Sequence, residues 1–487
     1  MSTKYLLGID NGGTNIKAAL FDMSGRQVAC KSANTPLVTP QEGYTQRSME
    51  ELMNVNYQLI AELVKEYGGD IAAVGLCGHG KGLYLLGKNR EIIYDGIGST
   101  DRRAQKYEIM WRNDGTEQKA YEKTAQKIMA CHPATLLKWL KENDIRVYEK
   151  VGYVLSVKDY VKYRLTGEIT TDYTDASGSG ILNLRTRNYD KDLLSLFDIP
   201  EMENNLPPII QSSEICGKIN RESAEKTGLK EGTPVVGGMF DIDACAVASG
   251  ASSEGDTCII AGTWSINECI SSKIADDHSV AMNSVFCDPK YYLAEESSAT
   301  SVGNLEWFKK ILRLPNYRCF EETVAQMRAD ECNIYYLPFL FASNENPLAK
   351  GALIGLGAHH EYTDIIRAVY EGVAFSHLTH MKALTKTLIH PKKAKLAGGV
   401  VNSDGWIHVF ADVLGIELEV TENIEIGTKG AAMAAGIGAG LFGNYGEATA
   451  AFVKTGKTVA PDPENVKIYK EKYEKYRQIV EALDKIW

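Results

Sequence analysis

Hydrophobic and polar positions in the first eighty residues predict strands that alternate with a helix. Apolar runs at 5–9 and 16–22 flank turn residues at 11–15, as in a β-hairpin. Apolar residues recur at helical spacing over 49–67, and a compact apolar strand follows at 71–77. Strands that alternate with helices predict an α/β layered fold.

The sequence of strand, glycine turn and strand recurs later in the chain. An apolar strand at 257–261 is followed by a turn at Gly262 and Thr263 and then by a second strand. Because 487 residues exceed what one hydrophobic core normally holds, we expect two domains, at 1–250 and 251–487. The similarity between the halves is one of pattern rather than of sequence.

Composition and charge narrow the class of protein. The formal net charge is −10 and no run of Lys or Arg stands out, which argues against a protein that binds nucleic acid. No apolar stretch approaches the ~20 residues of a membrane helix, and the first apolar run is too short for a signal peptide. The ten cysteines include no Cys-x-x-Cys pair. We therefore expect a cytoplasmic protein with small-molecule partners, without a nucleic-acid or membrane partner.

The first glycine turn has the residue types of a phosphate-binding loop. Gly12, Gly13 and Thr14 can present backbone N–H groups, and the glycines let an anion approach because no Cβ stands in the way. Asp10 before the turn could hold Mg²⁺ through oxygen, and Lys17 could add positive charge near phosphates. The alternative is an ordinary tight hairpin in which Asp10 caps the turn.

Two further glycine motifs fit a nucleotide held from a second domain. The turn at 262–263 has the form of the first turn, and two such turns could hold phosphates from opposite sides of a cleft. Gly398 and Gly399 end an apolar strand, where a flat ring could lie against the backbone and Asn402 could hydrogen-bond its edge. The alternative is a simple helix start with an N-cap at 403–404.

Asp241 is the strongest single candidate for catalysis. It lies between a strand at 233–238 and a helix of small residues at 244–250, so its carboxylate can point into a cleft and accept a hydroxyl proton. The competing interpretation is a helix N-cap formed by Asp241 or Asp243. From the local sequence alone, the known preference for Asp at that position favours the cap.

Two polar loops carry donors and acceptors that could match the hydroxyl groups of a sugar. His79, Gly80 and Lys81 follow the strand at 71–77, and Asp101 lies in the second loop. Selective recognition of hydroxyls leaves buried partners unpaired when a wrong substrate enters. The alternatives are a surface turn for the first loop and a solvated charge cluster for the second.

Taken in order, these motifs resemble those of the FGGY family of carbohydrate kinases over nearly the whole chain. Segments 351–356 and 364–372 match the family's C-terminal signature. Segment 131–143 keeps the proline, the tryptophan and the polar end of the N-terminal signature, and departs from it at Cys131 and at Leu136, where the family usually has lysine. The resemblance implies two ribonuclease-H-like domains, of the actin and hexokinase type, with a nucleotide cleft between them.

The resemblance also implies a role for each motif. Asp10 matches the family's magnesium-associated aspartate, and Asp241 matches its catalytic base, which reverses the preference for a helix cap. The implied ATP and phosphate contacts are Gly12, Gly13, Thr14, Lys17, Gly262, Thr263, Gly398, Gly399 and Asn402, and the implied sugar contacts are His79, Gly80, Lys81, Asp101 and Asp241.

Within the family, the chain is most similar to kinases of L-xylulose. It shares with them Gly-Lys-Gly at 80–82, Asp-Arg-Arg-Ala at 101–104 and Gly-Asn-Leu-Glu-Trp-Phe at 303–308. The implied reaction is transfer of the γ-phosphate of ATP, with Mg²⁺, to a terminal hydroxyl of a pentulose such as L-xylulose. A kinase of D-xylulose, glycerol, gluconate or another polyol is the alternative, followed by a non-catalytic sugar sensor. A homodimer is compatible with the sequence.

Overall fold

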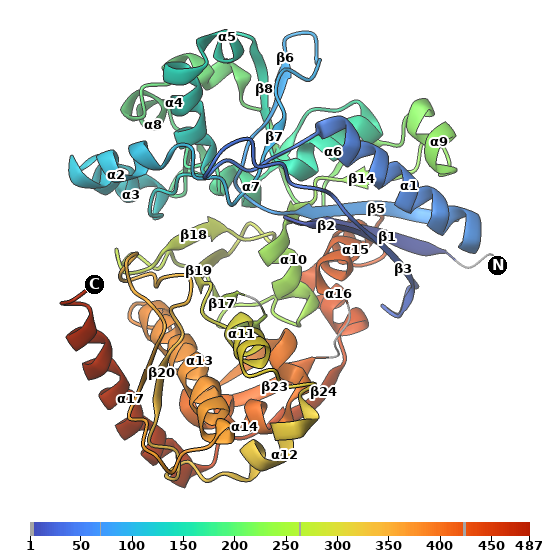
Figure 1. The fold of residues 1–487 in the computed structure, drawn as a ribbon. Coiled ribbons are helices and arrows are strands. Elements are labelled where there is room, and N and C mark those ends of the chain that lie inside the picture. Colours follow the sequence, from blue (N-terminus) through green and yellow to red (C-terminus); the bar gives the residue numbers. More distant parts are fainter. Residues whose placement is uncertain (1–3, 69, 263, 422–424) are drawn as a thin grey trace.

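Two large β-sheets organise the chain, one from each half of the sequence (Figure 1). The computed structural model describes residues 4–68, 70–262, 264–421 and 425–487. In spatial order, the first sheet contains β13 (Ile215–Lys218), β14 (Pro234–Val236), β5 (Ile71–Gly78), β1 (Tyr5–Asn11), β2 (Asn15–Phe21) and β3 (Gln27–Asn34), with β15 (Met239–Phe240) beside β5. The second contains β18 (Met282–Val285), β19 (Tyr292–Ser298), β17 (Ser265–Ser271), β16 (Thr257–Ala261), β22 (Lys393–Ala397), β23 (Glu417–Thr421) and β24 (Thr455–Val459).

The two sheets share one strand topology. In the first sheet, β1, β2 and β3 pair antiparallel, and β5 and then β14 continue parallel on the other side of β1. In the second sheet, β16, β17 and β19 pair antiparallel, and β22 and then β23 continue parallel on the other side of β16. The repeated hairpin predicted from the sequence is therefore confirmed, and so is the mixed α/β architecture.

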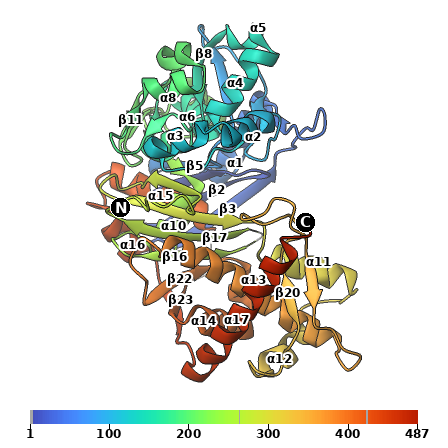
Figure 2. The same ribbon diagram turned by 90° about the vertical axis from the view of Figure 1, so that its left-hand side faces the viewer.

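Two helices lie between the sheets (Figures 1 and 2). They are α10 (Asp241–Ala248) and α15 (Ile426–Gly438), and one hydrophobic cluster joins them to both sheets. Although α15 comes from the end of the chain, it packs closely on β1, because a Cβ added to Gly8 would lie 1.9 Å from the Thr428 carbonyl oxygen. The two halves are thus joined by α10 and α15, and α15 packs across the middle of β1 and β5.

Longer helices cover the outer faces of the sheets. On the first sheet, α1 (Met49–Tyr67) packs its apolar side against β2 and β3. Below the second sheet, α13 (Tyr362–Leu384) and α14 (Asp404–Leu414) form the main core together with α17 (Pro463–Leu483), which runs along the outside of the molecule (Figure 1).

Smaller elements fill the remaining chain. In the first half they are β4 (Gln46–Arg47), β6 (Tyr84–Gly87), β7 (Gly96–Ile97), α2 (Gln105–Asn113), α3 (Thr116–Thr124), α4 (Pro133–Asn143), α5 (Ile145–Tyr148), β8 (Val151–Leu155), α6 (Val157–Thr166), β9 (Thr171–Asp172), α7 (Tyr173–Ser177), β10 (Leu182–Asn183), β11 (Asn188–Tyr189), α8 (Lys191–Leu196), η1 (Pro200–Asn205), β12 (Ile209–Ile210) and α9 (Arg221–Thr227). In the second half they are α11 (Gly303–Ile311), α12 (Arg318–Gln326), β20 (Tyr335–Leu337), β21 (Ala352–Ile354), η2 (Gly399–Asn402) and α16 (Tyr445–Phe452).

Three broad sequence expectations can be compared with this fold. The helix expected over 49–67 is present with those bounds, whereas the helix expected over 244–250 begins at Asp241 and ends at Ala248. In the part of the chain that the structure describes, no helix combines the length and apolar character needed to span a bilayer. All ten cysteines are free thiols.

Candidate active site

The first glycine turn connects β1 to β2 and is held from inside by an arginine. The Gly12 N–H donates to the Asn15 carbonyl oxygen at 3.0 Å, which closes the turn. The buried Arg47 donates to the carbonyl oxygens of both Gly12 and Gly13. Among the described residues, the N–H groups of Gly13 and Thr14 have no hydrogen-bond partner, and both residues are exposed. The turn therefore presents free donors to an anion. Arg47 was not singled out in the sequence.

Lys17 lies beside Asp10 on the neighbouring strand but pairs with a different carboxylate. Its Nζ forms an ion pair with Glu425, the residue that precedes α15. Burial opposes the charged form of Lys17, but Glu425 and Asp10 together hold its pKa above the usual value. Lys17 is therefore a charged link between the two halves of the chain, and its contact with a phosphate stays a prediction.

Asp10 faces the N-terminus of α15. Its Oδ2 atom would lie 2.4 Å from a Cβ added to Gly427, so only glycine leaves room for the carboxylate there. Burial raises the pKa of Asp10, although Lys17 and Cys77 work in the opposite direction. Its Oδ1 atom is buried and has no hydrogen-bond partner among the described residues. An unsatisfied carboxylate oxygen beside a glycine turn with free N–H donors fits Mg²⁺, which prefers oxygen ligands.

The second glycine turn and the paired glycines meet at one place. A Cβ added to Gly398 would lie 2.6 Å from the Ala261 carbonyl oxygen, next to Gly262. The Val302 N–H donates to the Gly262 carbonyl oxygen at 2.8 Å, and Val302 also packs against Gly399. Thr263, which was assigned to the same phosphate loop, lies outside the described residues.

Asn402 and its neighbour begin the helix α14. The Asn402 side-chain amide donates to the Gly399 carbonyl oxygen at 3.2 Å, which folds the short helix η2 behind the paired glycines. Ser403 is the N-cap of α14 and accepts from the Trp406 N–H at 3.1 Å. The helix-start interpretation of this segment is therefore correct for Ser403, and contact of a flat ring with Gly398, Gly399 and Asn402 stays a prediction.

Asp241 is the first residue of α10 and does not cap it. The N-cap is Phe240, and no side chain makes a capping hydrogen bond there, so the cap interpretation of Asp241 and Asp243 is wrong. Burial raises the pKa of Asp241 well above its usual value, and the charges of Asp10, Asp175 and Glu295 add to this effect. A carboxylate with a raised pKa is a stronger proton acceptor once it is ionised.

A hydrogen-bonded chain fixes the backbone just before Asp241. The Phe240 N–H donates to Thr174 Oγ1 at 2.8 Å, and the Thr174 hydroxyl donates to Asp172 Oδ2 at 2.7 Å. The other oxygen of Asp172 lies 2.8 Å from Lys158 Nζ. Sequence reasoning missed these residues, although the polar run at 171–177 between apolar elements was a signal for them.

Lys158 is the centre of a buried group of charges. We call this group the Lys158 network, and its members are Lys158, Lys162, Asp159, Asp172 and Asp175. Lys158 Nζ lies 2.7–2.9 Å from the three aspartates, and Lys162 Nζ lies 2.9 Å from Asp159. Burial opposes ionisation of Asp159, but the two lysines hold its pKa below the usual range, whereas burial raises the pKa of Asp175 to about 7.

A second group of carboxyl groups has no such compensation. Within the described part of the chain none of them forms an ion pair, so we call them the unpaired carboxylates: Asp10, Asp241, Asp243, Glu268 and Glu295. Asp243 accepts one hydrogen bond, from the Cys287 N–H at 3.0 Å, and neither oxygen of Glu268 has a partner. Burial raises the pKa of Asp243 and of Glu268 well above their usual values, and neighbouring carboxylates reinforce the shift.

The first polar loop lies beside the start of α10. A Cβ added to Gly80 would lie 2.4 Å from the Phe240 ring, so glycine allows the loop to approach the residue before Asp241. His79 Nε2 hydrogen-bonds Tyr84 at 3.0 Å. Burial, together with the nearby Arg47, lowers the pKa of His79 to about 3. His79 is therefore neutral at physiological pH and is engaged with the protein in this structure.

Lys81 and Asp101 were the other expected sugar contacts. Lys81 has a left-handed backbone conformation with φ of 63°, which is uncommon outside glycine and often marks a functional site. Asp101 is buried, and both of its oxygens accept from Arg103, while its Oδ2 also accepts from the Thr45 N–H at 2.6 Å. Asp101 therefore fixes its own loop, and its contact with a sugar stays a prediction.

Among the described residues, no group of three or more His, Cys, Asp or Glu side chains could hold a metal ion. Mg²⁺ is commonly bound through one or two carboxylates and keeps several waters, so the single carboxylate of Asp10 fits this cation.

Two family models match most of the chain. Residues 5–248 match the N-terminal domain, and residues 257–439 match the C-terminal domain, of the FGGY family of carbohydrate kinases. The chain belongs to the FGGY family of carbohydrate kinases, and it is an enzyme that phosphorylates a sugar. The two sheets of one topology and the helices between them are accordingly the ribonuclease-H-like kinase fold that the sequence predicted.

Individual relatives and solved structures agree with this family. The chain is 34% identical over 486 residues to an L-xylulose/3-keto-L-gulonate kinase of Escherichia coli K12, covering 99% of this chain and 97% of that protein. It is 32% identical over 483 residues to a probable L-xylulose kinase of Haemophilus influenzae, covering 98% and 99%. Among solved structures, gluconate kinase and ligand-bound xylulose kinase from Lactobacillus acidophilus match with TM-scores of 0.93 and 0.92, at 26% and 27% identity. The gluconate kinase match covers 99% of both chains, and the xylulose kinase match covers 99% of this chain and 98% of the other.

Proposed function

We propose that this kinase transfers the γ-phosphate of ATP to a terminal hydroxyl of a small ketose, with L-xylulose as the preferred substrate. The observation that carries the proposal is Asp241, an unpaired carboxylate with a raised pKa at the start of α10. The polar loop at Gly80 approaches Phe240, the residue before Asp241. The charge of Asp10 adds to the rise in the pKa of Asp241. The choice of L-xylulose is supported by the relatives at 34% and 32% identity.

The two glycine turns would hold the phosphates. The free N–H groups of Gly13 and Thr14 would contact the phosphates from one side. The backbone at Gly262 would contact them from the other side. We assign the adenosine to Gly398, Gly399 and Asn402, where the glycine backbone lies directly behind the second turn. We also propose that a boundary near residue 250 separates the two domains and that their closure excludes water.

Asp241 accepts the proton of the sugar hydroxyl as its oxygen attacks the γ-phosphorus. The new P–O bond forms while the bond to the β–γ bridging oxygen breaks, and ADP leaves with that oxygen. Backbone donors of both turns stabilise the charge that develops on the transferring group. Asp10 would hold Mg²⁺ through its unpartnered oxygen, and the ion would supply further charge neutralisation when bound. Thr174 keeps the backbone at Phe240 in place so that the Asp241 carboxylate points correctly.

A panel of substrates in a coupled ADP-release assay tests this function. We expect the highest kcat/KM with L-xylulose, compared with 3-keto-L-gulonate, D-xylulose, gluconate and glycerol, and a slow rate without sugar. A higher kcat/KM with glycerol or gluconate would show that the enzyme prefers another class of substrate. No ADP release with any sugar, or equal release without sugar, would contradict the catalytic assignment and revive the sugar-sensor alternative.

A further inference from the structure

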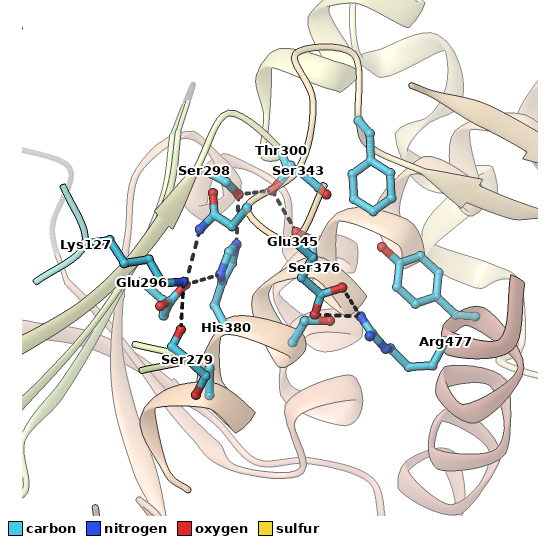
Figure 3. A pocket seen from close by; sticks show the side chains of 15 residues that line it. Lys127, Ser279, Glu296, Ser298, Thr300, Ser343, Glu345, Ser376, His380 and Arg477 are labelled. Atoms are coloured by element: carbon cyan, nitrogen blue, oxygen red, sulfur yellow. Dashed lines mark hydrogen bonds and ion pairs between the residues drawn. The ribbon is translucent and has the colours of Figure 1, made fainter. Parts of the chain in front are cut away.

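A separate cavity of about 380 Å³ lies in the second half of the chain (Figure 3). It is lined by residues of β19, α13 and α17, by a loop around Ser343, and by Lys127 from the first half. Glu296 lines this cavity from β19, whereas the neighbouring Glu295 points to the opposite face of the strand. None of the residues that we assign to the active site lines the cavity. Its volume falls in the range of small-molecule sites, about 300–1,000 Å³.

A row of hydrogen-bonded polar side chains crosses this cavity. Glu296 lies 3.3 Å from His380 Nδ1, and His380 Nε2 lies 2.8 Å from the Ser298 hydroxyl. The Thr300 hydroxyl then lies 2.7 Å from Ser298 and 2.7 Å from Ser376. All five side chains are buried. Each hydroxyl can accept two hydrogen bonds and donate one, so the row has remaining capacity for the hydroxyl groups of a ligand.

Two cationic side chains stand at opposite ends of the row (Figure 3). The only contact of Lys127 Nζ within the described residues is a long one, 3.4 Å, to the Ser279 carbonyl oxygen. Arg477 pairs with Glu345 through Nη1 at 2.9 Å, and its other nitrogens have no partner in the same part of the chain. Lys127 thus supplies an uncompensated positive charge at one end, and Arg477 supplies N–H donors at the other, where its charge is paired with Glu345.

The carboxylates of the cavity are already engaged. Glu296 accepts from His380, from the Asn344 amide and from the Ala281 N–H, and Glu345 is paired with Arg477. The charge of Glu345 is therefore compensated and the oxygens of Glu296 are occupied by hydrogen bonds, whereas Lys127 is free to meet an anion. A ligand that matches both features has several hydroxyl groups and one anionic group.

We propose that this cavity is a second binding site, for a small hydroxyl-rich anion such as a sugar acid or a sugar phosphate. The site is connected to the nucleotide region through the chain itself. Thr300 lines the cavity, and two residues later Val302 hydrogen-bonds Gly262 and packs against Gly399. Occupancy of the cavity should therefore alter the affinity for the nucleotide.

Isothermal titration calorimetry of the full chain tests the proposal with three probes. D-gluconate represents the sugar acids and D-ribulose 5-phosphate the sugar phosphates, and xylitol is the neutral comparison. Ala383→Tyr fills the cavity from α13 without removing a polar partner. Lys127→Gln removes the free charge, and Lys119→Gln makes the same change on an exposed part of α3 away from the cavity.

We expect at least one of the anions to bind at least about tenfold more tightly than xylitol. Binding at this site should weaken about tenfold in Lys127→Gln, disappear in Ala383→Tyr and stay unchanged in Lys119→Gln. Binding of D-gluconate would identify the anionic group of the ligand as a carboxylate, and binding of D-ribulose 5-phosphate would identify it as a phosphate. Because the active site also accepts sugars, the heat that is lost in Ala383→Tyr, and not the total heat, reports on the cavity.

The proposal would be overturned if neither anion bound the wild-type chain. It would also fail if Ala383→Tyr bound the anions as the wild type does, or if xylitol bound as tightly as they do. Sugar-dependent ADP release by Ala383→Tyr without added anion should equal that of the wild type, which shows that the variant folds and separates this result from the test of the proposed function.

Discussion

Two groups of buried or half-buried acidic side chains differ in their partners. The three aspartates of the Lys158 network share two lysines, with contacts of 2.7–2.9 Å. The unpaired carboxylates have no cation partner among the described residues. Ionising a buried carboxyl group without a partner is unfavourable, which is why burial raises the pKa values of Asp241, Asp243 and Glu268.

The difference separates residues that support the backbone from residues that are candidates for catalysis. The compensated group holds the backbone at Phe240 through Thr174, and each of its aspartates contacts a lysine within the protein. The uncompensated group includes Asp10, to which we assign the cation, and Asp241, to which we assign the role of proton acceptor. Strongly perturbed carboxyl groups that lack a structural partner are candidates for function, whereas paired ones are candidates for support.

The largest expected effect is that of Asp241→Asn, which removes the proton acceptor but keeps the shape of the side chain. We expect turnover to fall by about 10²–10⁴-fold, with ATP and sugar binding retained. The measurement is sugar-dependent ADP release together with calorimetric binding of the sugar. Asp192→Asn, at an exposed position, is the control and should change neither. Near-normal turnover in Asp241→Asn would remove Asp241 from the mechanism.

Lys158→Met tests whether the Lys158 network stabilises the fold. The change leaves three buried aspartates with one lysine, and removing one partner of a buried ion pair costs about 3–5 kcal/mol of unfolding free energy. Urea unfolding measures this loss. Lys123→Met removes a more exposed lysine that also contacts two aspartates, at 2.9 and 2.7 Å, and should cost less than about 1 kcal/mol. Equal losses in the two variants would show that the Lys158 network is not a special support.

Thr174→Ala tests whether Thr174 positions the backbone before Asp241. The variant loses the hydroxyl that accepts from the Phe240 N–H, so the backbone before Asp241 is less well fixed. We expect kcat to fall about tenfold, as for the loss of one buried hydrogen bond, with KM for the sugar little changed. Thr174→Ser keeps the hydroxyl and should restore kcat. A rise in KM at constant kcat, or no rescue by serine, would argue against a positioning role.

The sequence predicted those parts of this arrangement that depend on neighbouring residues. The hairpins at both glycine turns and the helix over 49–67 follow from local apolar spacing and turn chemistry. The start of α10 was mispredicted because Asp is favoured at N-caps, whereas β15 runs directly into the helix and leaves Phe240 as the cap.

Contacts between distant residues could not be predicted in this way. Lys17 and Glu425 are 408 positions apart, and Thr174 and Phe240 are 66 apart, so no local pattern joins them. The same holds for the packing of α15 on β1, which depends on the absence of a side chain at Gly8. Asp241 was identified because its motif resembles that of a family, and its environment became known only from the fold.

The smallest expected effect concerns the pH dependence of the reaction. Burial and the charges of Asp10, Asp175 and Glu295 raise the pKa of Asp241, so the acid limb of the kcat/KM profile should lie above the pH range of an ordinary carboxyl group. Glu295→Gln removes one of these negative charges, which favours the ionised form of Asp241 and lowers its pKa. The acid limb should therefore move to lower pH, while Glu464→Gln, at an exposed position, should leave it in place. A limb that moves to higher pH, or that does not move, would mean that the unpaired carboxylates do not act on Asp241 as one electrostatic group.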